Sequence, residues 1–433
     1  MVGGGLAGCE VSYFLAKQGI KVKLYEMRPK KMTEVHRTGR LAELVCSNSF
    51  KSIDPLNAEG ILKKEMKIMG SIVMNCAYKT KVPAGKALAV DRDEFSECVT
   101  NEVLQSGVIL IREEITKIDP KEDEIWVIAT GPATSLKLAD YLTHILGEDF
   151  FYFFDAVAPI VTKESIDMEK AFIGDRYGVG SGDYINCPMT KEEYEKFWLE
   201  LIKAETIPIE DFDKKYLFDR CRPVEDIAKS GEDALLYGPL KPKGLIDPKT
   251  GKEPYAVVQL RQDNIEGTLY NIVGFQTRLR WKEQRRVFRM IPCLKNAEFV
   301  RYGVMHRNIY INSREVLDEF LRLKKNKRIF FAGQITGVEG YLESAATGLY
   351  VGYTIKRMLD GKDPITLPIE TMLGSLIHYI TKGAAGKLKP MYANFGLFPD
   401  VGVKDKKKRK QIIAKISVDK MKRFVSEVMW CEV

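Results

Sequence analysis

The chain has 433 residues, 45% of them hydrophobic and 29% charged, which suits a globular protein of two or three domains. No uncharged apolar run approaches the roughly 18 residues of a membrane-spanning helix, and no signal peptide is visible, so neither a membrane protein nor a secreted one is expected. The eight cysteines form no C-x-x-C pair and there are only four histidines, so we expect no metal site and no disulfide framework, which fits a reducing cytoplasm.

A glycine turn opens the chain. Gly3, Gly5 and Gly8 form the pattern G-x-G-x-x-G, followed by a helix expected at about residues 7–18 and by Glu26 at the end of an apolar strand. Gly3 permits a sharp turn, Gly5 lets the backbone approach a pyrophosphate, and Gly8 lets the helix pack on its strand. The helix N-terminus then binds phosphates, and the acid accepts a hydrogen bond from the adenosine ribose. Because an acid there disfavours a 2′-phosphate, FAD or NAD is expected rather than NADP.

The first strand of this β-turn-α-β unit is short. Only Met1 and Val2 precede the turn, whereas a strand usually supplies about five residues. We therefore expect a chain extended by a few apolar residues to be more stable.

The next elements continue an α/β pattern. Helices are expected at 58–70 and 91–104, and strands at 108–115 and 124–129. The last strand ends in Ala-Thr-Gly-Pro, where Gly131 permits the backbone to pass close to a cofactor.

Residues 156–299 have a different character, with more proline, more aromatic residues and short alternating runs, which predicts a mixed α+β insertion domain. Within it, residues 278–289 contain six basic residues, one acid and two aromatic rings. Arg280 and Arg285 are candidates for binding RNA, because arginines beside aromatic rings suit the RNA backbone and base stacking. The alternative is an amphipathic helix with a charged outer face.

A second strand–loop–helix follows in the last third of the chain. Residues 328–333 predict a buried strand that ends in glycine, and 343–359 predict a helix. Gly333 and Gln334 lie in the loop between them, where they could close a flavin site from the far end of the chain. We therefore expect a Rossmann-like FAD-binding domain built from residues 1–155 and 300–433.

The basic excess of the chain is concentrated near its C-terminus. Residues 404–423 contain ten basic and two acidic residues, which equals the net charge of +8 for the whole chain. Apolar residues recur there at roughly helical spacing. The segment is interpreted either as a solvated surface helix or as a patch that binds nucleic-acid phosphates.

Long and unusual segments occur along nearly the whole chain: GGGLAGCE (3–10), LYEMRP (24–29), LAELVCSNS (41–49), VPAGKALAVDRDEF (82–95), ATGPATS (129–135), DYINCPMTKEEYE (183–195), GPLKPKGL (238–245), PYAVVQLRQDN (254–264), LYNIVGFQTRL (269–279), EFVRYGVMHRNIYINS (298–313), FFAGQITGVEGYLESAATGL (330–349) and ANFGLFP (393–399). In these segments the sequence resembles one known family, the folate- and FAD-dependent tRNA (uracil-5-)-methyltransferases. This TrmFO family comprises small relatives of the GidA tRNA-modifying flavoproteins.

The resemblance implies an enzyme that converts a T-loop uridine of tRNA to 5-methyluridine. The carbon donor is 5,10-methylenetetrahydrofolate, reduced FAD supplies the electrons, and NADPH or NADH reduces the flavin. By motif, the two functional cysteines fall on Cys46 and Cys221. A thiolate that adds to uracil C6 activates C5, and a second group must remove the C5 proton. Because Cys221 lies between two arginines, we expect it to be the nucleophile and Cys46 the acid/base or flavin-side group; the reverse assignment stays open.

The same motifs suggest further binding residues. His306 is a candidate for stacking on the folate pterin, and Arg28 for binding the cofactor. Further candidates for lining the flavin or folate cavity are Asn48, Arg92, Tyr341 and Glu343. No second glycine fingerprint locates the NAD(P)H site. We expect tRNA as partner, a monomer or weak homodimer, and cytoplasmic localisation. The alternatives are a GidA-like enzyme that modifies the wobble uridine and a flavoprotein that binds and remodels tRNA.

Overall fold

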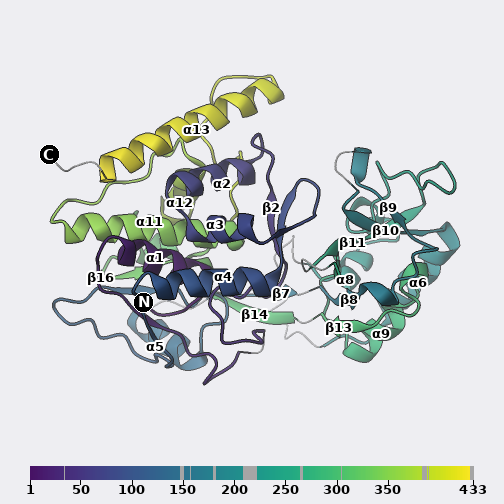
Figure 1. Cartoon of the computed structure of the whole chain (residues 1–433), viewed down its shortest axis with the longest axis horizontal. Coiled ribbons are helices and arrows are strands. Elements are labelled where there is room, and N and C mark those ends of the chain that lie inside the picture. The colour runs from purple at the N-terminus through teal and green to yellow at the C-terminus, as the bar shows by residue number, and fades with distance from the viewer. Residues whose placement is uncertain are drawn as a thin grey trace.

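The computed structural model describes residues 1–33, 35–146, 151–156, 158–178, 182–207, 222–263, 267–303, 305–382, 388 and 390–429. Two lobes lie side by side in Figure 1, each with its own hydrophobic core. The core of the large lobe (residues 1–146 and 309–429) is drawn from both ends of the chain, and the core of the small lobe (residues 158–303) from the middle. The antiparallel strands β7 (Phe151–Ala156) and β14 (Met305–Tyr310) run between the lobes.

A mostly parallel sheet forms the centre of the large lobe. Val2 forms isolated bridges with β1 (Lys23–Tyr25) on one side and β6 (Trp126–Ile128) on the other, and these two bridges take the place of a full first strand. The Val2 N–H donates to the Val127 carbonyl at 2.9 Å, and the Ala129 N–H donates to the Val2 carbonyl at 2.8 Å. The strand order is thus β5, β1, Val2, β6, β16, β15, with bounds β1 Lys23–Tyr25, β5 Ile109–Ile111, β6 Trp126–Ile128, β15 Arg322–Leu323 and β16 Asn326–Phe331.

Helices cover this sheet, and the lobe also contains a separate small antiparallel sheet. α1 and α11 pack closely because Gly348 has no side chain; a Cβ there would overlap the Ala7 carbonyl. The small sheet has the strand order β2 (Ser49–Ser52), β4 (Ala87–Val90), β3 (Lys81–Val82). The described α-helices of this lobe are α1 Leu6–Lys17, α2 Ala58–Ile68, α3 Ile72–Lys79, α4 Arg92–Gln105, α5 Leu136–Leu146, α10 Ser313–Val316, α11 Tyr341–Leu359, α12 Met372–Lys382 and α13 Lys406–Met429.

The small lobe is built on an antiparallel sheet of six strands, as expected for a mixed α+β insertion. Its order is β13-β8-β12-β11-β10-β9, with bounds β8 Ile160–Thr162, β9 Phe172–Ile173, β10 Tyr184–Met189, β11 Ala256–Gln262, β12 Leu269–Ile272 and β13 Phe299–Arg301. Among the described residues of this lobe, the α-helices are α6 Lys191–Lys203, α8 Val224–Ala228 and α9 Trp281–Phe288.

The basic segment near the C-terminus forms α13, which packs against α2 (Figure 1). Ile413, Met421 and Phe424 are buried on its inner face, and the ring of Phe424 lies 6.1 Å from that of Tyr353. The side chains of residues 406–409 are exposed. The segment is therefore part of the core on one side and a cationic surface on the other.

The expectation that the chain has no disulfides is wrong. Cys76 of α3 is bonded to Cys98 of α4, and Cys187 of β10 to Cys293, with Cα atoms 5.8 Å apart in both pairs. Spacing along the sequence hid these pairs, because 22 and 106 residues separate the partners and only helix and sheet packing brings them together. The cysteine pattern consequently no longer supports a reducing compartment.

We expect reduction to destabilise the protein. Opening the 22-residue loop between Cys76 and Cys98 should cost about 3 kcal/mol in the chain-entropy description. A non-reducing peptide map should contain both cross-linked peptides, and the Cys76→Ser/Cys98→Ser variant should unfold at lower denaturant than the unaltered chain. Free thiols at all four positions under oxidising conditions would contradict the pairing.

Candidate functional site

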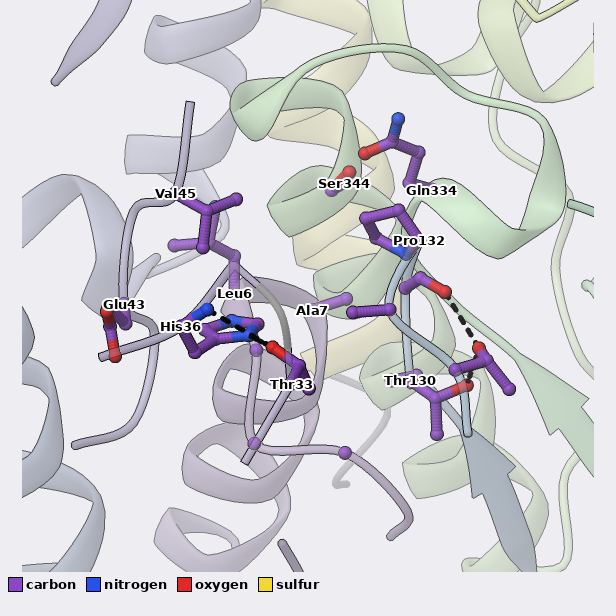
Figure 2. A pocket seen from close by; sticks show the side chains of 18 of the residues that line it. Leu6, Ala7, Thr33, His36, Glu43, Val45, Thr130, Pro132, Gln334 and Ser344 are labelled. Carbon is purple, nitrogen blue, oxygen red and sulfur yellow. Dashed lines mark hydrogen bonds between the residues drawn. The ribbon is translucent and has the colours of Figure 1, made fainter. Parts of the chain in front are cut away.

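A cavity lies at the carboxyl ends of the parallel strands, over the glycine turn (Figure 2). It has about 1720 Å³ of empty volume, part of it open to solvent. In Figure 2, Leu6 and Ala7 at the start of α1 lie between His36 on one side and Thr130 and Pro132 on the other. Gln334 lines the same cavity from the far end of the chain.

The predicted glycines form a tight turn that leaves open space at the N-terminus of α1. Gly3 has φ +101°, and a Cβ on it would lie 2.6 Å from the Ala129 carbonyl oxygen. A Cβ on Gly8 would overlap the Gly3 carbonyl, so this residue sets the close approach of α1 to the turn. Gly5 immediately precedes α1. A Cβ placed on Gly5 would have no neighbouring atom within 4 Å, so there is open space at the N-terminus of this helix. An anion in that space would meet the free N–H groups of the first helical turn.

Glu26 and Arg28 form a buried pair beside the turn. The Glu26 carboxylate accepts from the Gly4 N–H at 2.9 Å and pairs with the Arg28 guanidinium at 3.0 Å. Arg28 also contacts Glu43 at 3.1 Å. Burial opposes ionisation of Glu26, but the hydrogen bonds and charge of Arg28 lower its pKa below the usual value. Glu26 is therefore an anionic hydrogen-bond acceptor that Arg28 holds at the cavity wall.

Two loops from distant parts of the chain complete the wall. Gly131 follows β6 and Gly333 follows β16, and both have positive φ, 63° and 84°. The Gly333 N–H donates to Thr347 Oγ1 of α11 at 2.7 Å. Because β6 and β16 are parallel neighbours, the two loops meet at the same edge of the sheet.

Cys46 lies in the cavity wall against Tyr341 at the start of α11. The Tyr341 hydroxyl accepts from the N–H groups of Cys46, at 2.8 Å, and Ser47, at 3.2 Å, and it donates to Cys46 Sγ at 3.2 Å. Burial, and then the charge of Cys46, raise the pKa of Tyr341 well above its usual value. The hydroxyl therefore keeps its proton and acts as a donor to the sulfur.

Three largely buried arginines surround the Cys46 loop. Arg92 was predicted as a cavity residue but does not line the cavity, and Arg261 and Arg301 were missed in the sequence. Arg92 donates to the Leu44 carbonyl at 2.9 Å and pairs with Asp263; Arg301 donates to the Val45 carbonyl at 2.6 Å. Arg261 donates to the side chain of Asn48 at 3.1 Å. Asn48 is fully buried and joins the lobes rather than lining the cavity. Burial and the neighbouring Arg92 charge lower the pKa of Arg301 to about 10.

Glu343 also lies behind the wall and not in it. It is fully buried in the first turn of α11, where its Oε1 accepts from Lys51 Nζ at 2.7 Å. Lys51 itself lines the cavity and was not predicted, nor was His36, whose Nδ1 lies 2.6 Å from Thr33 Oγ1. Ordinary lysines and histidines in a loop carry no spacing signal, so neither could be found in the sequence.

The remaining predicted residues lie away from this cavity or outside the described ranges. Cys221 falls outside the described residues, and so does the side chain of His306, whose backbone belongs to β14. Arg280 and Arg285 lie at α9 on the small lobe, and neither lines the cavity. Arg285 donates to the Tyr302 hydroxyl at 2.8 Å, and the Tyr302 ring stacks on Trp281 at 5.4 Å, so a basic and aromatic surface does form there.

Comparison with known proteins identifies the family. The model of the family described as GIDA, glucose inhibited division protein A, matches residues 1–363. The chain belongs to the GidA family. A relative from Thermotoga sp. (strain RQ2), named methylenetetrahydrofolate--tRNA-(uracil-5-)-methyltransferase TrmFO, is 62% identical over 433 residues and 99% of both chains. A TrmFO from Thermosipho africanus is 60% identical over 98% of both chains. These full-length identities place the chain in the TrmFO group of the GidA family.

Solved structures of the GidA family confirm the α/β fold. The Aquifex aeolicus GidA in its form II crystal superposes with a TM-score of 0.72 at 17% identity, over 99% of this chain and 72% of that one. Across the described ranges, no helix of this GidA-family chain has the length and apolarity needed to cross a membrane. Nor do the described residues contain a group of three or more His, Cys, Asp or Glu side chains placed to hold a metal ion.

Proposed function

We propose that this chain binds FAD in the cavity and methylates a T-loop uridine of tRNA at C5. The full-length identity to enzymes named methylenetetrahydrofolate--tRNA-(uracil-5-)-methyltransferase carries the proposal. The cavity residues fit it, since Gly3, Gly5 and Gly8 leave room for a pyrophosphate and Glu26 for a ribose hydroxyl. The adenosine end of FAD would lie at Glu26 and the ring end toward Cys46 and Tyr341, with Gly131, Gly333 and Gln334 along its length.

The remaining chemistry follows from the cofactors. Bound FAD supplies electrons once NADPH or NADH has reduced it, and 5,10-methylenetetrahydrofolate supplies the one-carbon unit. Cys221 would add to uracil C6, which makes C5 nucleophilic toward the methylene carbon of the folate, and Cys46 would then remove the C5 proton as tetrahydrofolate leaves. A hydride would reduce the resulting exocyclic methylene to a methyl group as the bond between C6 and the Cys221 sulfur breaks. The Tyr341 hydroxyl, which donates to Cys46 Sγ at 3.2 Å, stabilises the thiolate that receives the C5 proton. His306 stacks on the pterin of the folate.

Two cationic surfaces fit tRNA. One is the surface around Arg280 and Arg285 on the small lobe, and the other is the outer face of α13, where residues 406–409 are exposed. We assign residues 1–155 and 300–433 to the FAD-binding domain and 156–299 to an insertion domain that helps to bind RNA. As a tRNA-modifying enzyme, the protein would act in the cytoplasm as a monomer or weak homodimer.

The Glu26→Gln variant should bind FAD about 10- to 100-fold more weakly, because a hydrogen bond to a charged group is worth about 1.5–3 kcal/mol. Titration of the apoprotein with FAD, followed by quenching of flavin fluorescence, measures the change. Glu97→Gln, on the exposed side of α4, is the matched control and should bind FAD like the unaltered chain. Equal affinity in both variants would remove Glu26 from the cofactor site.

A reconstituted reaction tests the function directly. It contains unmodified tRNA, methylenetetrahydrofolate labelled in its methylene carbon, NADPH and the FAD-loaded protein, with nucleosides analysed by mass spectrometry. Label in 5-methyluridine at the T-loop is expected. A yellow protein that oxidises NADPH without transferring label would support only the flavin part, and would favour wobble-uridine modification or tRNA remodelling.

A further inference from the structure

Lys51 occupies an unusual backbone position in the cavity wall. It is a non-glycine residue with φ 64°, and the register of β2 against β4 shifts between Ser49 and Ser52. A left-handed conformation is strained at such a residue and persists only where the surroundings enforce it. A shift of this kind redirects a side chain out of the regular alternation of the strand. The backbone is therefore strained at Lys51, the residue whose ammonium group reaches this wall.

Glu343 holds that ammonium group from behind. Its side chain has no exposure, whereas that of Lys51 is 30% exposed, and Nζ and Oε1 are 2.7 Å apart. Oε1 also accepts from the Ala393 N–H at 3.2 Å. Gly340 makes room for the pair, since a Cβ there would overlap Glu343 Oε2 and lie 2.9 Å from Lys51 Nζ. The pair is therefore a dipole whose positive end faces the cavity.

A second buried lysine adds positive charge to this region. Lys63 of α2 is almost fully buried and donates to the Ser52 carbonyl at 2.7 Å. Burial lowers the pKa of Lys63 to about 7, although the charge of Glu343 opposes the shift. When Lys63 is protonated, Lys51 and Lys63 both carry positive charge near Glu343, and Glu59 adds a second negative charge near Lys63.

No other lysine is found among the described residues that line the cavity, and Arg28 is the single arginine. Arg28 is neutralised by Glu26 and Glu43. Lys51 is connected to the Cys46 end instead, through Gly340 and the adjacent Tyr341. Lys51 is paired with one carboxylate where Arg28 is paired with two, and its partly exposed ammonium group remains accessible to a ligand at that end.

We propose that Lys51, positioned by Glu343, stabilises the negative charge that the flavin gains when it is reduced. This inference rests on the proposed binding of FAD. A hydride leaves NAD(P)H, which becomes NAD(P)⁺, and the neutral flavin accepts it and carries one negative charge. Because a cation nearby favours the charged product over the neutral reactant, the midpoint potential of the bound flavin is raised.

The midpoint potential of bound FAD, titrated anaerobically against a reference dye, tests the proposal. Lys51→Met should reduce the equilibrium preference for reduced flavin at least tenfold, which is about 30 mV for two electrons. Lys51→Arg should keep the potential near that of the unaltered protein. Lys81→Met, which removes an exposed lysine from strand β3 at the far side of the same small sheet, is the matched control and should leave the potential unchanged.

Lys51→Met leaves a buried carboxylate without its partner, which can disrupt folding. The double variant Lys51→Met/Glu343→Gln avoids this and should lower the potential less than Lys51→Met does. Glu343→Gln alone should raise it. Unchanged potentials in the folded, yellow single and double variants would overturn the role of Lys51. If the unaltered chain bound no FAD at all, the proposed function would fail instead, which is a distinct and visible result.

Discussion

The Cys221→Ala variant is expected to fold and retain FAD but to form no 5-methyluridine. Without the C6 nucleophile, uracil C5 cannot attack the one-carbon unit, so no later step proceeds. Cys46→Ala should instead retain a trace of activity, because loss of an acid/base group costs about 10²–10⁴-fold. Single-turnover formation of labelled 5-methyluridine, with FAD content read from the visible spectrum, measures both effects.

The controls for these variants come from the same chain. Cys9→Ala changes a buried free cysteine that does not line the cavity, and it should leave methylation within a few-fold of normal. Tyr341→Phe removes the hydroxyl that contacts Cys46 Sγ and should lower the rate in the same step as Cys46→Ala. If Cys46→Ala were fully inactive and Cys221→Ala retained a trace of activity, the assignment would be reversed, with Cys46 as the nucleophile and Cys221 as the acid/base group. Full activity in both variants would remove thiol chemistry from the mechanism.

Neutralising the exposed side of α13 should weaken tRNA binding while leaving the fold intact. The variant Lys406→Gln/Lys407→Gln/Lys408→Gln/Arg409→Gln removes four exposed charges. If each contacts a phosphate, the slope of log affinity against log salt should fall by roughly 3–4, with a loss of at least about 10²-fold at physiological salt. Filter binding or fluorescence anisotropy across a salt series gives both values.

Deleting residues 404–433 is the weaker experiment, because α13 belongs to the core. Deletion removes buried Ile413, Met421 and Phe424, and loss of one large core side chain costs about 3–5 kcal/mol. We expect the truncated chain to be too unstable to report on binding. Neutralising Lys17, Lys21, Lys23 and Lys30 is the matched control, since these four residues are exposed elsewhere on the large lobe. Equal salt slopes in both variants would leave α13 with a structural role alone.

The elements that local rules specify were predicted well. The helices expected at 7–18, 58–70 and 91–104 are found at 6–17, 58–68 and 92–105, and the strand–loop–helix at 328–359 is confirmed. These elements follow from apolar periodicity and from glycines with positive φ, both of which are short-range properties. The helix at 72–79 was missed because it is only eight residues long and follows α2 after three residues.

What the sequence determined by itself is the glycine turn with its acid, the family motifs and the position of Cys46 among them. Only the tertiary structure shows which residues from distant parts of the chain contact Cys46 and Lys51 in the cavity wall. The hydroxyl of Tyr341 and the sulfur of Cys46 are 295 residues apart in the chain, and Lys51 and Glu343 are 292 apart. The same holds for the two disulfides and for the buried face of α13. A glycine that a tight turn requires can be recognised from the residues next to it in the sequence. A contact between distant segments depends instead on how helices and sheets pack, and the spacing of residues along the chain does not predict it.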